Sequence, residues 1–223
     1  MKQAFTLIEL IFVIIVIGIL SAVMIPNIEN NSLKQAAQQI AADIRYTQHL
    51  AMIDDKYSSN SEWYKGRWQI VFGNNNQYAN YQPSCTVFSD SFNPSTNSYS
   101  GDPKESEIAI DPSNNSHIMT GGYNNTAALD YTNSGFKGSK RFNLGEMYGI
   151  SSVTLSNGCS YGRISFDYLG RPFTGDQSTM IGPYNASSQR LIVQDCNITL
   201  THNNGDTIVI TVAPETGYIK VNY

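Results

Sequence analysis

The sequence has few charged residues and few of the residue types that carry catalysis or bind metals. Charged residues make up 14% of the 223, and only three histidines and three cysteines are present. His49, His117 and His202 are scattered along the chain with no nucleophile motif beside them, so we expect neither an enzyme nor a cofactor. The cysteines form no Cys-x-x-Cys pair and have no histidine at ligand spacing, which argues against a zinc site.

Basic residues are too few for a typical nucleic-acid binder. The chain has 14 Lys and Arg against 18 Asp and Glu, a formal net charge of −4, whereas nucleic-acid binders usually carry a basic excess. The one basic cluster, residues 137–141, could contact phosphates. Three positive charges on an acidic background more often form a solvated loop, and this is the interpretation we favour.

A long apolar run stands at the N-terminus of this sequence. It extends from Phe5 to Ile25, about 30 Å as a helix, which matches the hydrocarbon core of a bilayer. Glu9 is the only charged residue in the run, and Lys2 is the only charged residue before it. A carboxylate in a membrane-length segment is a functional-site hypothesis by default, because charge is costly in lipid.

Three other interpretations of the run stay open. A secretory signal peptide would be shorter and would end in small residues, for which Ser21 and Ala22 are a weak candidate. A plain membrane anchor would account for the length but not for Glu9 near its start. A buried core helix is rarely apolar on every face at this length.

The residues around Glu9 carry a resemblance to a known family. Residues 4–9 read Ala-Phe-Thr-Leu-Ile-Glu after a short basic leader, and this block resembles the N-terminus of type IV prepilins and type II secretion pseudopilins. The resemblance implies that a prepilin peptidase removes residues 1–4 by cutting between Ala4 and Phe5, and then methylates the Phe5 amine. It also implies that Glu9 acts in filament assembly. Ala4 stands where the family more commonly has glycine.

Helical periodicity continues beyond the apolar run. Pro26 and the asparagines after it predict a bend or loosening of the helix before Ser32, where a capping box could restart it. We expect one long helix to about Asp54, covering residues 5–54. Its second half presents an apolar stripe with helical spacing, formed by Leu33, Ala37, Ile40, Ile44 and Ala51.

Residues 63–223 predict a β-rich head. Runs of β-branched and aromatic residues between turn formers predict strands at 68–72, 86–88, 107–110, 152–155, 163–167, 190–193, 197–202, 207–212 and 217–221. Short turns between the last of them predict an antiparallel meander that the helix covers on one face. The expected fold class is therefore α+β, with a long N-terminal helix, transmembrane at about 5–25, packed on an antiparallel sheet. Residues 73–149 are expected to form a long, loop-rich insertion with a few extra strands.

An exported head would permit a disulfide. Cys159 and Cys196 each lie at the edge of a strand-like segment, so we prefer this pair and leave Cys85 unpaired. Three cysteines allow three single pairings, and the other two stay open.

Acidic and amide side chains in the head raise the question of a calcium site. Asp54, Asp55 and Asp90 could supply oxygen ligands together with the Asn-rich loops. No segment has the alternating acidic spacing of a defined calcium loop, so we favour solvated turns and expect no metal.

Two motifs near the C-terminus extend the resemblance. Residues 166–172, Phe-Asp-Tyr-Leu-Gly-Arg-Pro, and residues 216–219, Thr-Gly-Tyr-Ile, look like the corresponding turn and ending of H-type minor pseudopilins of type II secretion. FimT-like minor pilins share that fold. The resemblance implies the pilin fold in a single-pass protein of the bacterial inner membrane, with the head in the periplasm.

The partners that this resemblance implies are other pseudopilins or pilins, the prepilin peptidase and the inner-membrane assembly platform. The function that the resemblance implies is that of a minor pseudopilin subunit of a type II secretion pseudopilus. The alternative function is that of a FimT-like minor type IV pilin that acts in pilus assembly or DNA uptake, although the acidic balance makes nucleic acid an unlikely partner. The large, loop-rich head favours a low-copy subunit over a major one.

Overall fold

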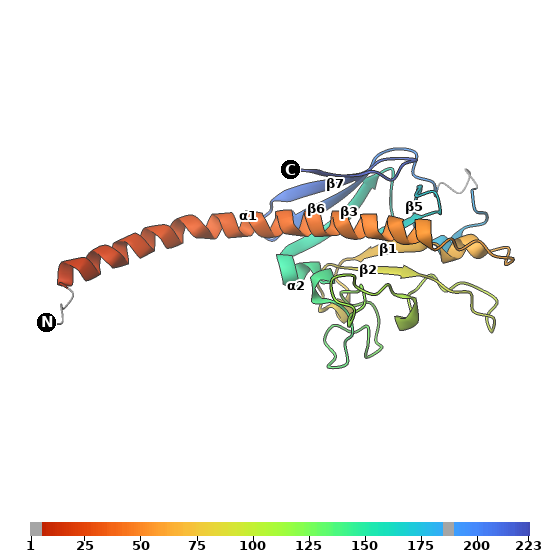
Figure 1. Cartoon of the computed structure of the whole chain (residues 1–223), viewed down its shortest axis with the longest axis horizontal. Coiled ribbons are helices and arrows are strands. Elements are labelled where there is room, and N and C mark those ends of the chain that lie inside the picture. Colours follow the sequence, from red (N-terminus) through yellow and green to blue (C-terminus); the bar gives the residue numbers. More distant parts are fainter. Residues whose placement is uncertain (1–5, 185–189) are drawn as a thin grey trace.

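A computed structural model describes residues 6–184 and 190–223, apart from the side chains of residues 22–31. One long helix, α1 (Leu7–Ile53), lies along a head built from two four-stranded antiparallel sheets and projects far beyond it (Figure 1). The predicted α+β class, with a helix packed on antiparallel sheets, is confirmed. The helix ends as predicted, since Asp54 is its C-cap and donates its N–H to the Leu50 carbonyl at 2.9 Å.

α1 is one unbroken helix in its backbone, as predicted, and it does not restart at Ser32. Figure 1 shows a gentle curvature of its projecting part. The bend predicted at Pro26 falls on a residue whose side chain lies outside the described part of the chain, and it stays a prediction.

The second half of α1 is buried against the head along the predicted stripe. Its five apolar members are each at most 4% exposed, and they join the largest hydrophobic cluster of the molecule. Ala36 and Ala41 are buried beside them, and their small side chains let the helix lie close to the strands. Tertiary packing therefore stabilises this half of the helix, as expected for an amphipathic helix.

The strands form two separate sheets where the sequence predicted one meander. The first sheet has the order β2-β1-β4-β5, with bounds Ser84–Ser89, Trp68–Gly73, Arg163–Phe166 and Pro172–Thr174. The second has the order β3-β6-β7-β8, with bounds Ile150–Asn157, Cys196–His202, Thr207–Val212 and Ile219–Asn222. Only β6 to β8 form the expected meander, and β3 joins it by pairing with β6.

Three details of the strand prediction are wrong. Residues 107–110 and 190–193 make isolated bridges in place of strands: Ile108 bridges to Phe88, and Leu191 to Phe173. β5 was missed because it has only three residues and begins with Pro172, which cannot donate a backbone hydrogen bond. The smaller helical elements are α2 (Leu144–Tyr148) and single 3₁₀ turns at Trp63–Gly66, Gln77–Ala79, Glu105–Glu107, Lys140–Phe142 and Gln177–Thr179.

The segment 73–149 is an integral part of the head, since it contains β2 and α2. Beyond β2 it covers the outer edge of the first sheet. Val87 in β2 donates its N–H to the Met119 carbonyl at 2.9 Å and accepts the Ala109 N–H at 3.0 Å, and Gly121 donates to the Cys85 carbonyl at 3.0 Å. Its apolar side chains enter the core, since Met119 is fully buried.

One asparagine joins the two sheets. Asn74 directly follows β1, and its side-chain amide donates to the Val153 carbonyl in β3 at 2.7 Å and accepts the Val153 N–H at 2.9 Å. The amide thus occupies the place that a neighbouring strand backbone would take. It satisfies the edge of β3 at the point where the sheets meet.

Candidate functional site

The first turn of α1 is closed by a reciprocal interaction between Thr6 and Glu9. Thr6 is the N-cap, and its Oγ1 accepts the Glu9 N–H at 3.4 Å. Glu9 Oε2 accepts the Thr6 N–H and the Thr6 hydroxyl, each at 2.8 Å. This is a capping box, and a carboxylate at this end of the helix also interacts favourably with the helix dipole. The residue that the resemblance selected is therefore held in place by its own helix.

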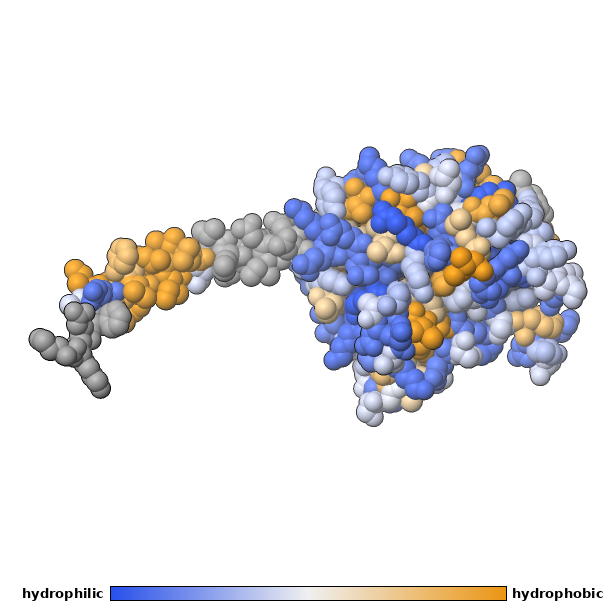
Figure 2. All heavy atoms as spheres, viewed as in Figure 1, coloured by the Kyte–Doolittle hydropathy of each residue, from blue (hydrophilic) through white to orange (hydrophobic). Residues whose placement is uncertain are grey.

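Beyond this turn, α1 presents a projecting apolar surface, which we call the arm (Leu7–Ser21). Its large apolar side chains are between 37% and 78% exposed. Figure 2 shows this hydrophobic surface concentrated on the arm, whereas the visible face of the head is largely hydrophilic. A contiguous exposed apolar surface of this kind marks an interaction site. Among the described residues, no helix combines the length and apolar character that a bilayer crossing requires.

The packed half of α1 (Ser32–Ile53) fixes the arm to the head through side-chain bonds as well as apolar contacts. Arg45 donates from Nη2 to the Ile219 carbonyl at 2.8 Å. Gln48 Nε2 donates to the Gly170 carbonyl at 2.8 Å and to the Thr216 carbonyl at 2.9 Å. Gly170 and Thr216 belong to the two C-terminal motifs, residues 166–172 and 216–219. These motifs, 46 residues apart in the chain, therefore meet at one side chain of α1.

Both motifs need glycine at this meeting point. Gly170 and Gly217 have φ angles of +80° and +62°, a conformation that other residues rarely adopt. A Cβ atom on Gly217 would lie 2.6 Å from Gln48 Nε2 and 2.7 Å from the Gly170 carbonyl oxygen. The glycines thus permit both the turn and the close approach of the helix.

The first motif is a turn organised by Asp167. Its Oδ1 accepts the Leu169 N–H at 3.0 Å and the Arg171 N–H at 2.9 Å, and its Oδ2 accepts Arg171 Nε at 2.8 Å. A short acidic side chain that bonds to the backbone two residues on is a common turn device. The motif therefore has a structural role in seating α1.

A buried ionic network joins α1 to the segment 73–149. Arg141 Nη1 donates to both oxygens of Asp43 on α1, at 2.8 and 2.9 Å. Its Nη2 and Nε donate to the two oxygens of Asp111, each at 2.9 Å. The Arg141 side chain is only 14% exposed. The expectation of a solvated loop at 137–141 is therefore wrong for Arg141, although Lys140 beside it is exposed.

This network has two carboxylates for one guanidinium, so one negative charge is in excess. Burial raises the pKa of Asp43 to about 6 in spite of Arg141. Burial also acts to raise the pKa of Asp111, but hydrogen bonds from Arg141 and Ser113 outweigh it and hold that pKa below its ordinary value. Asp43 is therefore the carboxylate that takes up a proton first.

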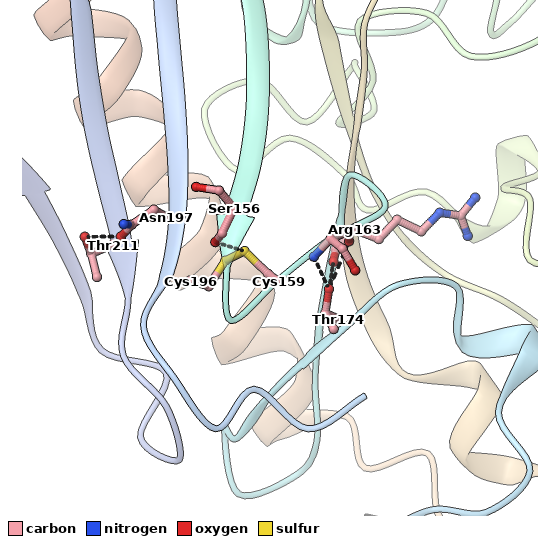
Figure 3. Close-up of a disulfide and its surroundings, with 8 residues drawn as sticks. Ser156, Cys159, Arg163, Thr174, Cys196, Asn197 and Thr211 are labelled. Carbon is pink, nitrogen blue, oxygen red and sulfur yellow. Dashed lines mark hydrogen bonds between the residues drawn. A yellow bond between two sulfur atoms is a disulfide. The ribbon is translucent and has the colours of Figure 1, made fainter. Parts of the chain in front are cut away.

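The structure contains the preferred disulfide. Cys159, two residues after β3, is bonded to Cys196, the first residue of β6, with their Cα atoms 5.0 Å apart (Figure 3). The bond fixes the end of the second sheet, where Asn157 pairs with Cys196. Cys85 is free and buried, and burial raises the pKa of its thiol.

Removing this disulfide should destabilise the head substantially. The bond closes a loop with a sequence separation of 37 residues, so the double variant Cys159→Ser/Cys196→Ser is expected to lose about 3–4 kcal/mol of unfolding free energy. Urea denaturation of the oxidised full chain in detergent measures this loss. Cys85→Ala, which leaves the bond intact, is the matched control. Equal stability of the double variant and the wild type would contradict the prediction.

The structure places only some of the other predicted site residues. Ala4 and Phe5 lie outside the described residues. Groups of three or more metal-ligating side chains are absent from the described ranges, and Asp54 instead accepts Trp68 Nε1 at 2.8 Å and pairs with Lys56. The network around Arg141 was missed, yet the sequence held a signal for it. Asp43 lies on the buried face of a helix, where a charge needs a partner.

No protein-family model, curated protein or solved structure matches the chain significantly.

Proposed function

We propose that this chain is a minor pseudopilin subunit of a type II secretion pseudopilus, assembled through its N-terminal helix. The observation that carries the proposal is the exposed apolar arm, whose first turn holds Glu9 in a capping box with Thr6. The helix of the arm continues without a break into the core of the head. An apolar arm joined to a polar head needs an apolar environment. Lipid provides it before assembly, and the helices of neighbouring subunits provide it afterwards.

In this proposal the apolar run 5–25 anchors the subunit in the bacterial inner membrane, with the head in the periplasm. A prepilin peptidase removes residues 1–4 and methylates the Phe5 amine. Because both members of the Thr6–Glu9 capping box follow the cut, processing would leave the box in place. The mature helix would thus keep its ordered first turn.

Glu9 would then set the register of assembly. Its carboxylate and the Phe5 ammonium group of a neighbouring subunit are both poorly tolerated in lipid, and pairing them relieves both. Burying one of them without the other is strongly unfavourable. A lone subunit therefore stays in the membrane until the filament offers a counter-charge, with the assembly platform and the other pseudopilins as partners.

The processing step is tested by the mass of the mature protein. We expect intact-mass and N-terminal peptide spectrometry to find a chain that begins at Phe5 with a methyl group on its amine. Ala4→Arg, which places a large charged residue before the cut, should block processing and leave Met1 in place. A mature chain that begins at Met1, or one cut after Ala22, would sink the proposal.

A FimT-like minor type IV pilin is the second candidate, and it rests on the same arm and head. The two candidates differ in their partners, so the genes that flank this one and co-purification with secretion or pilus components separate them. A salt-dependent DNA shift by the full chain in detergent would favour a role in DNA uptake. The net charge of −4 argues for the secretion role.

A further inference from the structure

An open pocket lies at the end of the head farthest from the arm. Its volume is about 420 Å³, within the range of sites that hold small groups. Its lining comes from the segment after α1, the start of β1 and the end of β2. These elements lie together at the end of the head away from the projecting half of α1 (Figure 1). It is lined by Lys56, Trp63, Gly66, Trp68, Ser89, Asp90, Ser91, Phe92, Tyr99, Ser106 and Glu107.

The walls of this pocket are aromatic. Both tryptophans of the chain line it, together with Phe92 and Tyr99, whose ring centroids are 5.7 Å apart. Gly66 lets Tyr99 approach the backbone, because a Cβ atom there would lie 3.3 Å from a Tyr99 ring carbon. One wall already attracts a cation, since Lys56 Nζ lies 5.2 Å from the centroid of Trp68.

A buried carboxylate, that of Asp90, belongs to a residue that also lines the pocket and forms no ion pair with another described residue. Asp90 is 4% exposed, and from the residues that the structure describes its oxygens accept the Gly101 N–H at 2.6 Å and the Ser100 hydroxyl at 3.2 Å. None of the ion pairs between described residues includes Asp90. Each carboxylate oxygen has two lone pairs, so Asp90 can accept further bonds.

The remaining charges at the pocket are matched within the head. Glu107 pairs with Lys104 at 3.0 Å and accepts the Lys104 N–H at 2.8 Å, and Lys56 pairs with Asp54. Burial raises the pKa of Asp90, and the nearby Glu107 carboxylate adds to that shift. Lys104 nearby acts in the opposite direction without outweighing these two effects, and a further cation placed at Asp90 would offset them.

We propose that this pocket receives a lysine or arginine side chain of a partner protein, held between Asp90 and the aromatic rings. The aromatic faces attract a cation, the carboxylate forms a charge-assisted hydrogen bond to it, and the volume admits one long side chain. A metal ion fits less well, because groups of three metal-ligating side chains are absent from the part of the chain that the structure describes. The position at the far end of the head leaves the pocket open when the arm is packed among other helices.

The intrinsic fluorescence of the two tryptophans reports directly on this pocket. The full chain, in a polyoxyethylene detergent that is neither cationic nor a sugar, is titrated with N-acetyl-arginine amide and N-acetyl-lysine amide. We expect saturable changes in emission with dissociation constants of about 1–10 mM, as suits one side chain. N-acetyl-glutamine amide, which has no charge, should leave the emission unchanged.

Variants assign the binding to Asp90 and the rings. Asp90→Asn should weaken the affinity about 10-fold or more, because it removes the charge of the acceptor. The exposed Asp195→Asn, which makes the same change of net charge elsewhere, should not weaken it. Phe92→Leu removes a half-buried ring without a change of charge, and it should weaken binding even if Asp90→Asn proves too unstable to measure.

Several results would overturn the proposal. They are saturation by the glutamine amide, equal affinity in Phe92→Leu and the wild type, and affinity that does not fall as the salt concentration rises. A change in emission with glucose or N-acetylglucosamine but with neither cationic amide would assign the pocket to a saccharide and would also overturn it. Each of these outcomes is independent of the processing test, so failure here leaves the proposed function standing.

Discussion

Replacing Glu9 with glutamine is expected to leave the protein anchored and processed but to keep it out of the filament. The proposed pairing of Glu9 with a neighbouring Phe5 amine requires a negative charge. Removing one partner of such a pair in a low-dielectric environment costs about 3–5 kcal/mol. Incorporation should therefore fall by on the order of 100-fold or more. Quantitative blotting of sheared filaments against membrane fractions measures it.

The capping box makes the choice of variant important. Glu9→Ala would remove both the charge and the bond to Thr6, so its failure to assemble would have two explanations. Glu9→Gln keeps an acceptor for the Thr6 N–H and removes only the charge. The matched control is Thr6→Ala, which weakens the cap, by about 1 kcal/mol, and keeps the charge.

These two variants give opposite results under the two explanations. If charge pairing drives assembly, Glu9→Gln fails and Thr6→Ala assembles nearly as well as the wild type. If the ordered first turn is what matters, Thr6→Ala fails and Glu9→Gln assembles. Normal incorporation of Glu9→Gln would refute the assembly role of this carboxylate.

Arg141→Met should destabilise the head strongly. It leaves Asp43 and Asp111 buried without a cation, and breaking a buried ion pair in this way costs about 3–5 kcal/mol. Lys140→Met removes the same charge one residue earlier, at an exposed position, and should change the stability by less than about 0.5 kcal/mol. Urea denaturation of the full chain in detergent gives both values.

A rescue experiment shows whether unpaired charge is the cause. Adding Asp43→Asn and Asp111→Asn to Arg141→Met removes the orphaned charges, so it should recover part of the lost free energy. If the triple variant recovers none of the lost free energy, unpaired charge is not the main cause of the loss. The lost packing of the Arg141 side chain, whose Cζ lies 4.1 Å from the Phe142 ring centroid, is then the larger contribution.

Local patterns predicted the helix and most strands correctly. The stripe from Leu33 to Ala51 has a strict helical period, and every predicted member is buried. β6 and β7 alternate apolar and polar residues around a tight turn, and their bounds agree with the predicted ones to within one residue. In these segments the local preference and the tertiary contacts favour the same structure.

The division into two sheets depends on contacts that a local pattern does not contain. β1 pairs with β4, which lies some 90 residues later, and β3 pairs with β6 across the disulfide loop. Short segments such as β5 take their conformation from these neighbours and have no clear preference of their own. The segments 107–110 and 190–193 have strand-like composition, yet they find partners only at single bridges.

The candidate sites differ in the same way. Glu9 was found from sequence because a lone charge in an apolar run is a local signal. The pocket around Asp90 draws its lining from the segment after α1, the start of β1, the end of β2 and a loop near Glu107, so no single stretch reveals it. The meeting of Gly170 and Gly217 at Gln48 gives a structural reason for two motifs whose role is not evident from local sequence.

The backbone bonds between Val87 and residues 109 and 119 have a consequence for solubility. They occupy the hydrogen-bonding groups along the outer margin of β2, which would otherwise be a template for another strand. Two heads therefore cannot join by adding strands at this margin, and uncontrolled sheet aggregation in a crowded compartment is blocked there. Trimming residues 109–121 from the loop-rich segment would expose this margin of β2 and invite such aggregation.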